Sequence, residues 1–207
     1  MNLVELHGRS LELAAGVVGT VQPEQLVLPT PCAGWSLRRL LEHLVGQQLG
    51  FTAAARGAGP DLACWRDVPV AGDPAGAFRH SAARLAAAFA RAAAAPDPAP
   101  LWLPEVRADE PVPFHAAVGF HLLDTLVHAW DVAVSLGSPA RLVAAVEAEP
   151  ELAGTLLAVA GAVPAGPADR GPGQAFTAPG TPTGAAGPFD RALALLGRDP
   201  AWALPLR

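Results

Sequence analysis

The sequence between residues 120 and 133 reads FHLLDTLVHAWDVA, and this stretch decides the fold. Apolar residues recur in it at intervals of three and four positions, which is the period of one apolar helical face. They are Leu123, Leu126, Val127 and Trp130, with Val134 one turn further on. The pattern predicts a helix over residues 114–136. Gly137 is a suitable C′ residue for it, and Pro139 follows.

Polar residues follow one line along this otherwise apolar helix. Asp124 and His128 are four positions apart, so their Cβ atoms lie about 5–6 Å from each other on a helix. His121 precedes Asp124 by one turn, and Asp131 follows His128 by one turn. A buried polar group costs free energy unless it is paired or bound to a metal. This line therefore predicts where the functional site lies.

Helical patterns also dominate the rest of the chain, and strand signals are weak. Long amphipathic helices are predicted at 3–21, 37–55 and 75–95, and Ser36 is a suitable N-cap for the second of them. Shorter helices are predicted between 140 and 162, with a break near Pro150, and at 190–197. The sequence thus predicts an all-α protein: a four-helix bundle over residues 1–140, and a helical and irregular C-terminal extension over 141–207 that packs on the bundle.

Composition excludes several classes of protein. The chain has 207 residues, 51% of them hydrophobic, which is enough for one sizeable core. The net charge of −5 argues against nucleic acid as the main partner. No apolar run reaches the roughly 18 residues of a membrane span, and the N-terminus lacks the basic region of a secretory signal. The two cysteines, Cys32 and Cys64, are too few for a disulfide framework. We expect a cytoplasmic protein with free thiols.

Several single residues outside the polar line have an ordinary structural interpretation. His7 is expected on the surface, and His80 and Arg84 are expected on a solvated helix face. His115 is expected to cap a helix or to lie at the surface. Cys32 is either a reactive thiol near a helix start or a packed structural cysteine, and the structural interpretation is the default.

His43 lies at the border of the apolar face of the predicted helix 37–55. If this helix faces the polar line, His43 joins Asp124 and His128. Two imidazoles and one carboxylate match open sites for Zn, Fe, Mn, Co or Ni. This spacing also occurs by chance in many helical proteins. The alternative is a hydrogen-bonded pair in which Asp124 or Asp131 fixes His128.

Three stretches resemble one known family. Residues 30–46, TPCAGWSLRRLLEHLVG, resemble the entry into the second helix of the mycothiol-dependent maleylpyruvate isomerase family, which belongs to the DinB-like metalloenzyme bundles. Residues 124–133, DTLVHAWDVA, resemble a later helix of that family. The segment 195–202, LLGRDPAW, resembles a tail found in one actinobacterial branch. The resemblance covers nearly the whole chain and implies a DinB-like four-helix bundle.

The same resemblance implies a chemistry. It implies a divalent metal held by His43, Asp124 and His128, with zinc as the first candidate and Ni, Mn, Fe or Co as alternatives. These three residues are then both metal ligands and catalytic residues, and Asp131 fixes the helix or one of the ligands. Asp124 stands where the family's maleylpyruvate isomerase has Glu, which is one methylene longer. Members of the wider group transfer or add small thiols, so mycothiol is implied as a cosubstrate.

Two further kinds of residue are considered for substrate binding. Trp35 and Trp130 are expected in the core rather than stacked on a ligand. Arg38, Arg39 and Arg84 are each suited to bind a substrate carboxylate, and the sequence selects none of them.

Three functions are compatible with these features. The first is a metal-dependent enzyme that uses a small thiol for S-transfer, thiol addition or thiol-assisted isomerisation of a small molecule. The second is a natural-product tailoring enzyme, a cyclase or isomerase, that uses the same cavity with or without metal. The third is a non-catalytic bundle that binds a small molecule or dimerises. A homodimer is compatible with all three.

Overall fold

The structure is a computed structural model that describes all residues except 71, 167–169, 172–174, 182–185 and 205–207. Within the described part it has seven α-helices and no named strand. The helices are α1 (Leu3–Val18), α2 (Leu37–Ala55), α3 (Pro74–Ala93), α4 (Phe114–Ser135), α5 (Ala140–Glu147), α6 (Pro150–Ala162) and α7 (Pro188–Leu195). Two short 3₁₀ helices, Pro23–Val27 and Leu62–Trp65, lie in the loops before and after α2. The predicted all-α fold is confirmed.

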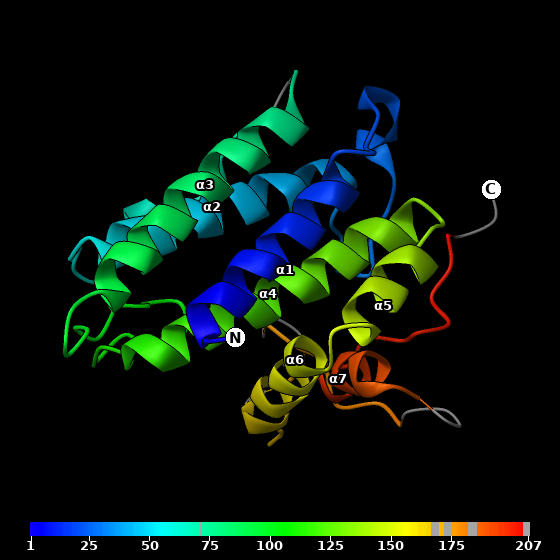
Figure 1. Cartoon of the computed structure of the whole chain (residues 1–207). Helices are drawn as coiled ribbons and strands as arrows, with labels where there is room; N and C mark the ends of the chain where they lie inside the picture. Colours follow the sequence, from blue (N-terminus) through cyan, green and yellow to red (C-terminus); the bar gives the residue numbers. More distant parts are fainter. Residues whose placement is uncertain (71, 167–169, 172–174, 182–185, 205–207) are drawn as a thin grey trace.

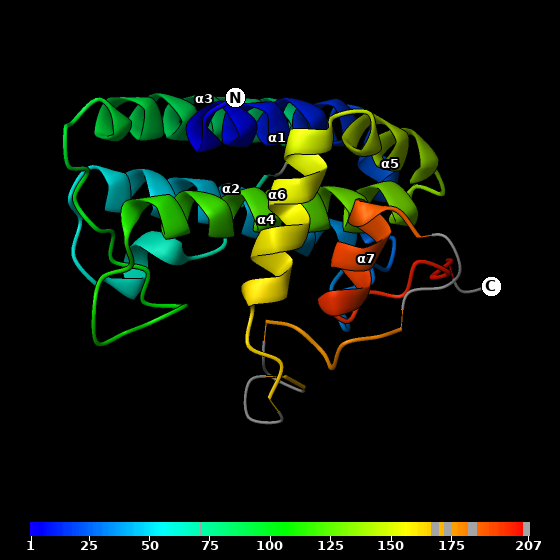
Figure 2. The ribbon, with the colours of Figure 1, turned by 60° about the horizontal axis from the view of Figure 1, so that its bottom comes forward.

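The four long helices form a bundle of two layers. Figure 2 shows α1 and α3 in one layer and α2 and α4 in the other. Helix α1 packs against α3 and α4, and α2 also packs against α3 and α4. The three short helices lie on one side of the bundle (Figure 1), where α6 crosses α4 and α7 packs against α5 and α6.

Helix α4 is the central element, because nearly all of it is buried. It ends as predicted at Gly137, whose φ of 71° is accessible to glycine at little cost. The Gly137 N–H donates to the Val134 carbonyl over 3.0 Å, and the Ser138 N–H donates to the Ala133 carbonyl over 2.9 Å. These two bonds are those of a Schellman motif.

Local sequence signals set the helix starts. The Asn2 side chain accepts from the Glu5 N–H and the Glu5 side chain accepts from the Asn2 N–H, which forms a capping box at α1. Ser36 caps α2 as predicted, with its hydroxyl 3.4 Å from the Arg39 nitrogen. The predicted interruption near Pro150 is confirmed, because Pro150 opens α6. Helix α1 ends three residues before the predicted position, since its C-cap is Gly19.

The C-terminal helices share a core with the bundle. Leu152 and Leu156 of α6 and Phe189 of α7 are fully buried in the same hydrophobic cluster as Leu126 and Trp130 of α4. The segments after residue 140 therefore bury apolar area against the bundle, which stabilises both parts. The division of the chain at residue 140 stays a prediction. No helix in the described ranges is long and apolar enough to cross a membrane.

Candidate metal site

The structure brings together the three residues that the sequence selected. His43 comes from α2, and Asp124 and His128 come from α4. One ligand atom of each lies within 4.8 Å of the others, and His128 Nε2 is 3.3 Å from Asp124 Oδ1. The side chains are 19%, 26% and 11% exposed in that order, so the group lies at an accessible edge of the core.

Both histidines are oriented by a carboxylate on the Nδ1 side of the ring. His128 Nδ1 donates to Asp131 Oδ2 over 2.9 Å, and His43 Nδ1 is 3.4 Å from Asp67 Oδ1. A proton held on Nδ1 leaves the lone pair of Nε2 free. Metal-binding histidines are oriented in this way by carboxylates behind them. Asp131 was expected to fix a ligand, and its position agrees with that role; Asp67 was not predicted from the sequence.

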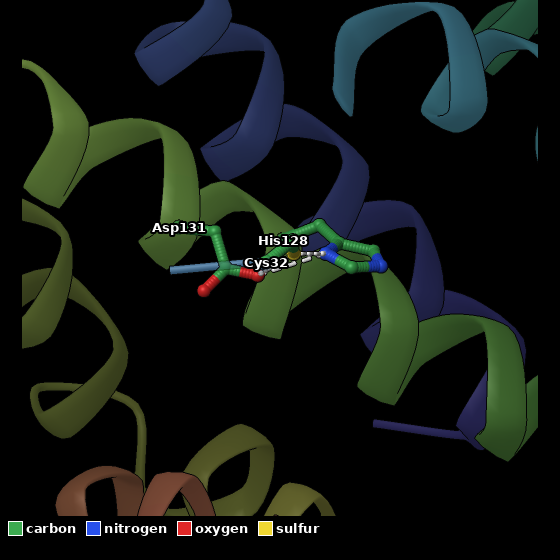
Figure 3. Close-up of side chains that lie close together, drawn as sticks. All are labelled: Cys32, His128 and Asp131. Carbon is green, nitrogen blue, oxygen red and sulfur yellow. Dashed lines mark hydrogen bonds and ion pairs between the residues drawn. The ribbon is translucent and has the colours of Figure 1, made fainter. Parts of the chain in front are cut away.

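Asp131 is itself held by a residue from the far end of the chain. Arg198 donates from Nε to Asp131 Oδ1 and from Nη2 to Asp131 Oδ2, both over 2.9 Å. Cys32 Sγ lies 3.3 Å from Asp131 Oδ2 and 3.8 Å from His128 Nδ1 (Figure 3). Cys32 is partly buried, and it packs against the main hydrophobic cluster while its sulfur contacts the polar line. Arg198 was not predicted at this site, although it belongs to the 195–202 segment.

Charges and hydrogen bonds outweigh burial in setting the pKa values of His128 and Asp124, whereas burial decides the pKa of His43. Burial alone lowers the pKa of His128, but attraction to Asp124 and hydrogen bonds to Asp124, Asp131 and Cys32 raise that pKa well above its usual value. Burial raises the pKa of Asp124, yet the nearby histidines, His128 first, lower it overall. The pKa of His43 is lowered, mainly by burial. In the metal-free protein, His128 is therefore an imidazolium between two carboxylates.

The residues present fit a divalent metal ion. Asp124 Oδ2 is enclosed and has no hydrogen-bond partner among the described residues, although a buried carboxylate oxygen normally has one. Two imidazole nitrogens and one carboxylate oxygen form a common set of ligands with open positions. Cys32, His128 and Asp131 form a second compact group. The Arg198 guanidinium already holds both oxygens of Asp131 there, and its positive charge disfavours a second cation.

An aromatic ring and an arginine form the rim of the group. The Trp35 ring lies 4.9 Å from the His43 ring and 6.5 Å from the His128 ring, measured between centroids. The Arg39 guanidinium lies 4.5 Å above Trp35. Trp35 was expected in the core; it packs against the main hydrophobic cluster but stays partly exposed, because the loop before α2 places it beside the two histidines. Trp130 is buried, as predicted. Of the three candidate arginines, Arg39 is the one that stacks on Trp35 among the described residues.

The prediction for His7 was wrong. His7 is fully buried, and its Nε2 lies 2.9 Å from His121 Nδ1 between α1 and α4. The signal was present in the sequence, because His7 lies four residues after Leu3 and four before Leu11 on the apolar face of α1. His80 and His115 are exposed, as predicted.

Comparisons with known proteins agree with this architecture. The family model described as the mycothiol maleylpyruvate isomerase N-terminal domain matches residues 8–133. That range contains His43, Asp124, His128 and Asp131, and it excludes Arg198.

Two relatives and one solved structure extend the comparison. Two uncharacterized proteins, from two strains of Mycobacterium tuberculosis, are each 32% identical over 201 residues, which is 96% of this chain and 98% of theirs. The crystal structure of the mycothiol-dependent maleylpyruvate isomerase matches with a TM-score of 0.54 at 14% identity, over 78% of this chain and 69% of that one. At this identity the likeness shows the fold alone. The family match over residues 8–133 confirms the resemblance seen in the sequence, and this chain belongs to the mycothiol maleylpyruvate isomerase N-terminal domain family.

Proposed function

We propose that this protein is an enzyme in which His43, Asp124 and His128 hold a divalent metal that activates a small thiol of the mycothiol type. The substrate is a small molecule, and the reaction is S-transfer, thiol addition or thiol-assisted isomerisation. Family membership supports the thiol and the reaction class, because the family description and the solved structure both refer to a mycothiol-dependent isomerase.

The proposal that these residues bind a metal rests on how their candidate ligand atoms are arranged. Both histidines have a carboxylate on Nδ1, and Asp124 Oδ2 is enclosed with no partner among the described residues. One ligand atom each of His43, Asp124 and His128 thus lies within 4.8 Å of the others, in reach of a single ion. A group of polar residues that served only stability would be expected to satisfy that oxygen, since leaving it unpaired costs about 1–3 kcal/mol.

When bound, a divalent metal supplies a Lewis acid that lowers the pKa of a coordinated thiol and polarises a carbonyl oxygen. Residues of this chain would supply the ligands that hold the metal. His43 offers a neutral nitrogen, because burial lowers its pKa. His128 would offer Nε2 once the metal displaces the proton there, because Asp131 accepts a hydrogen bond from Nδ1. Asp124 offers a negative charge, which offsets part of the cation's charge. The shorter side chain of Asp124, compared with Glu, keeps this oxygen close to α4.

The rim residues would orient the substrate. Trp35 shields the two imidazole rings from water on one side, and Arg39 is held above Trp35. A guanidinium binds a carboxylate through two parallel hydrogen bonds, so Arg39 is suited to an acidic substrate. Asp67 lies 3.9 Å from Arg39 at the surface and does not saturate its donors.

In an isomerisation, the thiolate would add to a conjugated double bond, and a C–S bond forms as the π electrons move to the adjacent carbonyl oxygen. Rotation about the new single bond and loss of the thiolate would restore the double bond in the other geometry. No net oxidation occurs and no proton is consumed. In S-transfer, the same thiolate would displace a leaving group, and the leaving group departs with the electron pair.

The test is elemental analysis of untagged protein for wild type, His43→Ala, His128→Ala and the control His80→Ala, whose side chain is exposed on α3. We expect close to one metal per chain in wild type and His80→Ala, and loss in the other two variants. Wild-type protein with no metal, and no uptake of added Zn, Ni or Mn, would contradict the proposal.

The reaction class is tested separately. Metal-loaded protein is incubated with an α,β-unsaturated keto acid or an alkyl halide, with and without a cysteinyl thiol of the mycothiol type. We expect turnover that needs both the thiol and the metal. Turnover without any thiol would favour the tailoring-enzyme hypothesis. No turnover with full metal occupancy would favour a binding protein.

A further inference from the structure

We propose that Arg198 is a positioning residue for His128 that acts through Asp131, so that the segment after α7 forms part of the candidate metal site. This inference rests on the proposed metal role of His128. It extends that role to a residue outside the range matched by the family model, 8–133.

The backbone at the end of α7 sets the position of Arg198. Gly197 has a φ of 71°, and its N–H donates to the Ala194 carbonyl over 3.0 Å. The Arg198 N–H donates to the Leu193 carbonyl over 2.9 Å. These bonds form a Schellman motif in which Arg198 is the C″ residue. The reversal of the chain at Gly197 directs the Arg198 side chain back toward α4.

The Arg198 guanidinium forms a fixed, two-pronged contact. It donates to both oxygens of Asp131 over 2.9 Å, and its Nη2 also lies 3.4 Å from Cys32 Sγ. Asp131 is 0% exposed and Arg198 is 9% exposed. A bidentate pair fixes the plane of the carboxylate as well as its position, which a single point charge does not do.

The plane of Asp131 in turn fixes the His128 ring. Oδ2 of Asp131 accepts from His128 Nδ1 and from Arg198 Nη2. The side chain of Asp131 therefore has one orientation that satisfies both neighbours. With Arg198 in place, His128 keeps its Nδ1 proton and directs Nε2 toward Asp124 and His43.

A purely structural role is the competing interpretation, and a second arginine allows the two to be separated. Arg170 is also buried in the C-terminal part, and among the described residues it donates to the carbonyls of Pro164, Val163 and Thr177. Arg170→Lys thus tests the loss of a buried arginine whose hydrogen bonds within the described ranges reach neither the proposed metal ligands nor Asp131.

The first measurement is zinc affinity, determined by competition with a chromogenic chelator, for wild type, Arg198→Lys and Arg170→Lys. Lysine keeps the positive charge that Asp131 needs but loses the bidentate geometry. We expect Arg198→Lys to bind zinc about 10–100-fold more weakly, as for other groups that orient metal ligands. Arg170→Lys is expected to bind as wild type does. Equal affinity for wild type and folded Arg198→Lys would overturn the inference.

The second measurement needs no metal. In apo protein labelled with ¹⁵N-histidine, the Hδ1 proton of His128 is assigned by its loss in His128→Ala. We expect slow exchange of this proton with solvent in wild type and Arg170→Lys, and fast exchange in Arg198→Lys. Slow exchange in all three would contradict the inference. If wild type binds no zinc, the proposed function fails while this measurement still decides the role of Arg198.

If Arg198→Lys does not fold, a double-mutant cycle replaces it. Asp131→Asn with Arg198→Met removes both charges, so no unpaired buried charge remains. We expect the double variant to bind zinc as weakly as Asp131→Asn alone, because Arg198 acts through Asp131. A further loss of affinity in the double variant would show that Arg198 acts independently, and the inference would be wrong.

Discussion

His7 of α1 and His121 of α4 are in direct contact inside the bundle, with His7 Nε2 2.9 Å from His121 Nδ1. The pair lies between Phe51 and Phe89, and Thr125 Oγ1 is 3.1 Å from His121 Nδ1. His7 Nδ1 and His121 Nε2 have no hydrogen-bond partner among the described residues. Burial lowers the pKa of His121 to about 4 and the pKa of His7 well below its usual value. Both rings are therefore neutral in the folded protein at neutral pH.

The first prediction is that acid destabilises the fold through this pair. Between pH 6.5 and about 4 the unfolded chain binds a proton at His121 and the folded chain does not, so the free energy of unfolding falls as the pH falls. One pKa unit corresponds to about 1.4 kcal/mol, so the effect of His121 is a few kcal/mol. Urea denaturation of metal-free protein at several pH values measures it. His121→Gln should flatten the dependence in this window and the exposed-residue control His80→Gln should not. Equal slopes in all three proteins would show that the pair does not control acid stability.

The second prediction concerns the charge at position 124. Asp124→Asn keeps the shape of the side chain but removes its negative charge, so we expect it to bind zinc at least about tenfold more weakly. Asp124→Glu restores a carboxylate and is expected to retain binding. Zinc at 100 times its Kd should raise the free energy of unfolding of wild type by about 2.7 kcal/mol, which thermal denaturation detects. If zinc at that concentration stabilises Asp124→Asn as much as wild type, Asp124 is not a zinc ligand.

The third prediction compares the two carboxylates behind the histidines. Asp67 is 40% exposed and 3.4 Å from His43 Nδ1, whereas Asp131 is fully buried and 2.9 Å from His128 Nδ1. Water can replace an exposed partner, so Asp67→Asn should weaken zinc binding by less than about tenfold, and Asp131→Asn by more. Chelator competition measures both. If Asp67→Asn weakened zinc binding more than Asp131→Asn does, burial would not determine how much each carboxylate contributes to zinc affinity.

The fourth prediction concerns the close approach of α2 to the loop after the second 3₁₀ helix. A Cβ atom at Gly46 would lie 2.5 Å from the Arg66 carbonyl oxygen, whereas a Cβ at Gly8 of α1 would meet nothing within 4 Å. Gly46→Ala should destabilise the protein by about 1–3 kcal/mol. Gly8→Ala should stabilise it by about 0.5–1 kcal/mol, because alanine favours a helix interior. Chemical denaturation compares the two variants, and a neutral Gly46→Ala would show that the loop moves aside at no cost.

The helices were predictable from the sequence because their signals are local. The apolar period over residues 120–134 is visible along the chain, and so are the stops at Gly137 and Pro150. Ser36 as an N-cap was identified for the same reason, since a cap interacts only with the first turn of its own helix. Asp124 and His128 were neighbours in the prediction because both lie on one helix.

Contacts between helices depended on the tertiary structure. Periodicity places a residue on a face but does not say which residue of another helix it meets, so the contact between His7 and His121 could not be predicted. The approach of His43 to α4 was only a conditional expectation, and the ring of Trp35 was expected in the core. Asp67 and Arg198 lie in loops, where no periodicity predicts their position. The packing of the helices brings Asp67 to His43 and Arg198 to Asp131. Local periodicity thus determined the helices and the pairing of Asp124 with His128, while burial of a shared core decided which distant side chains complete the site.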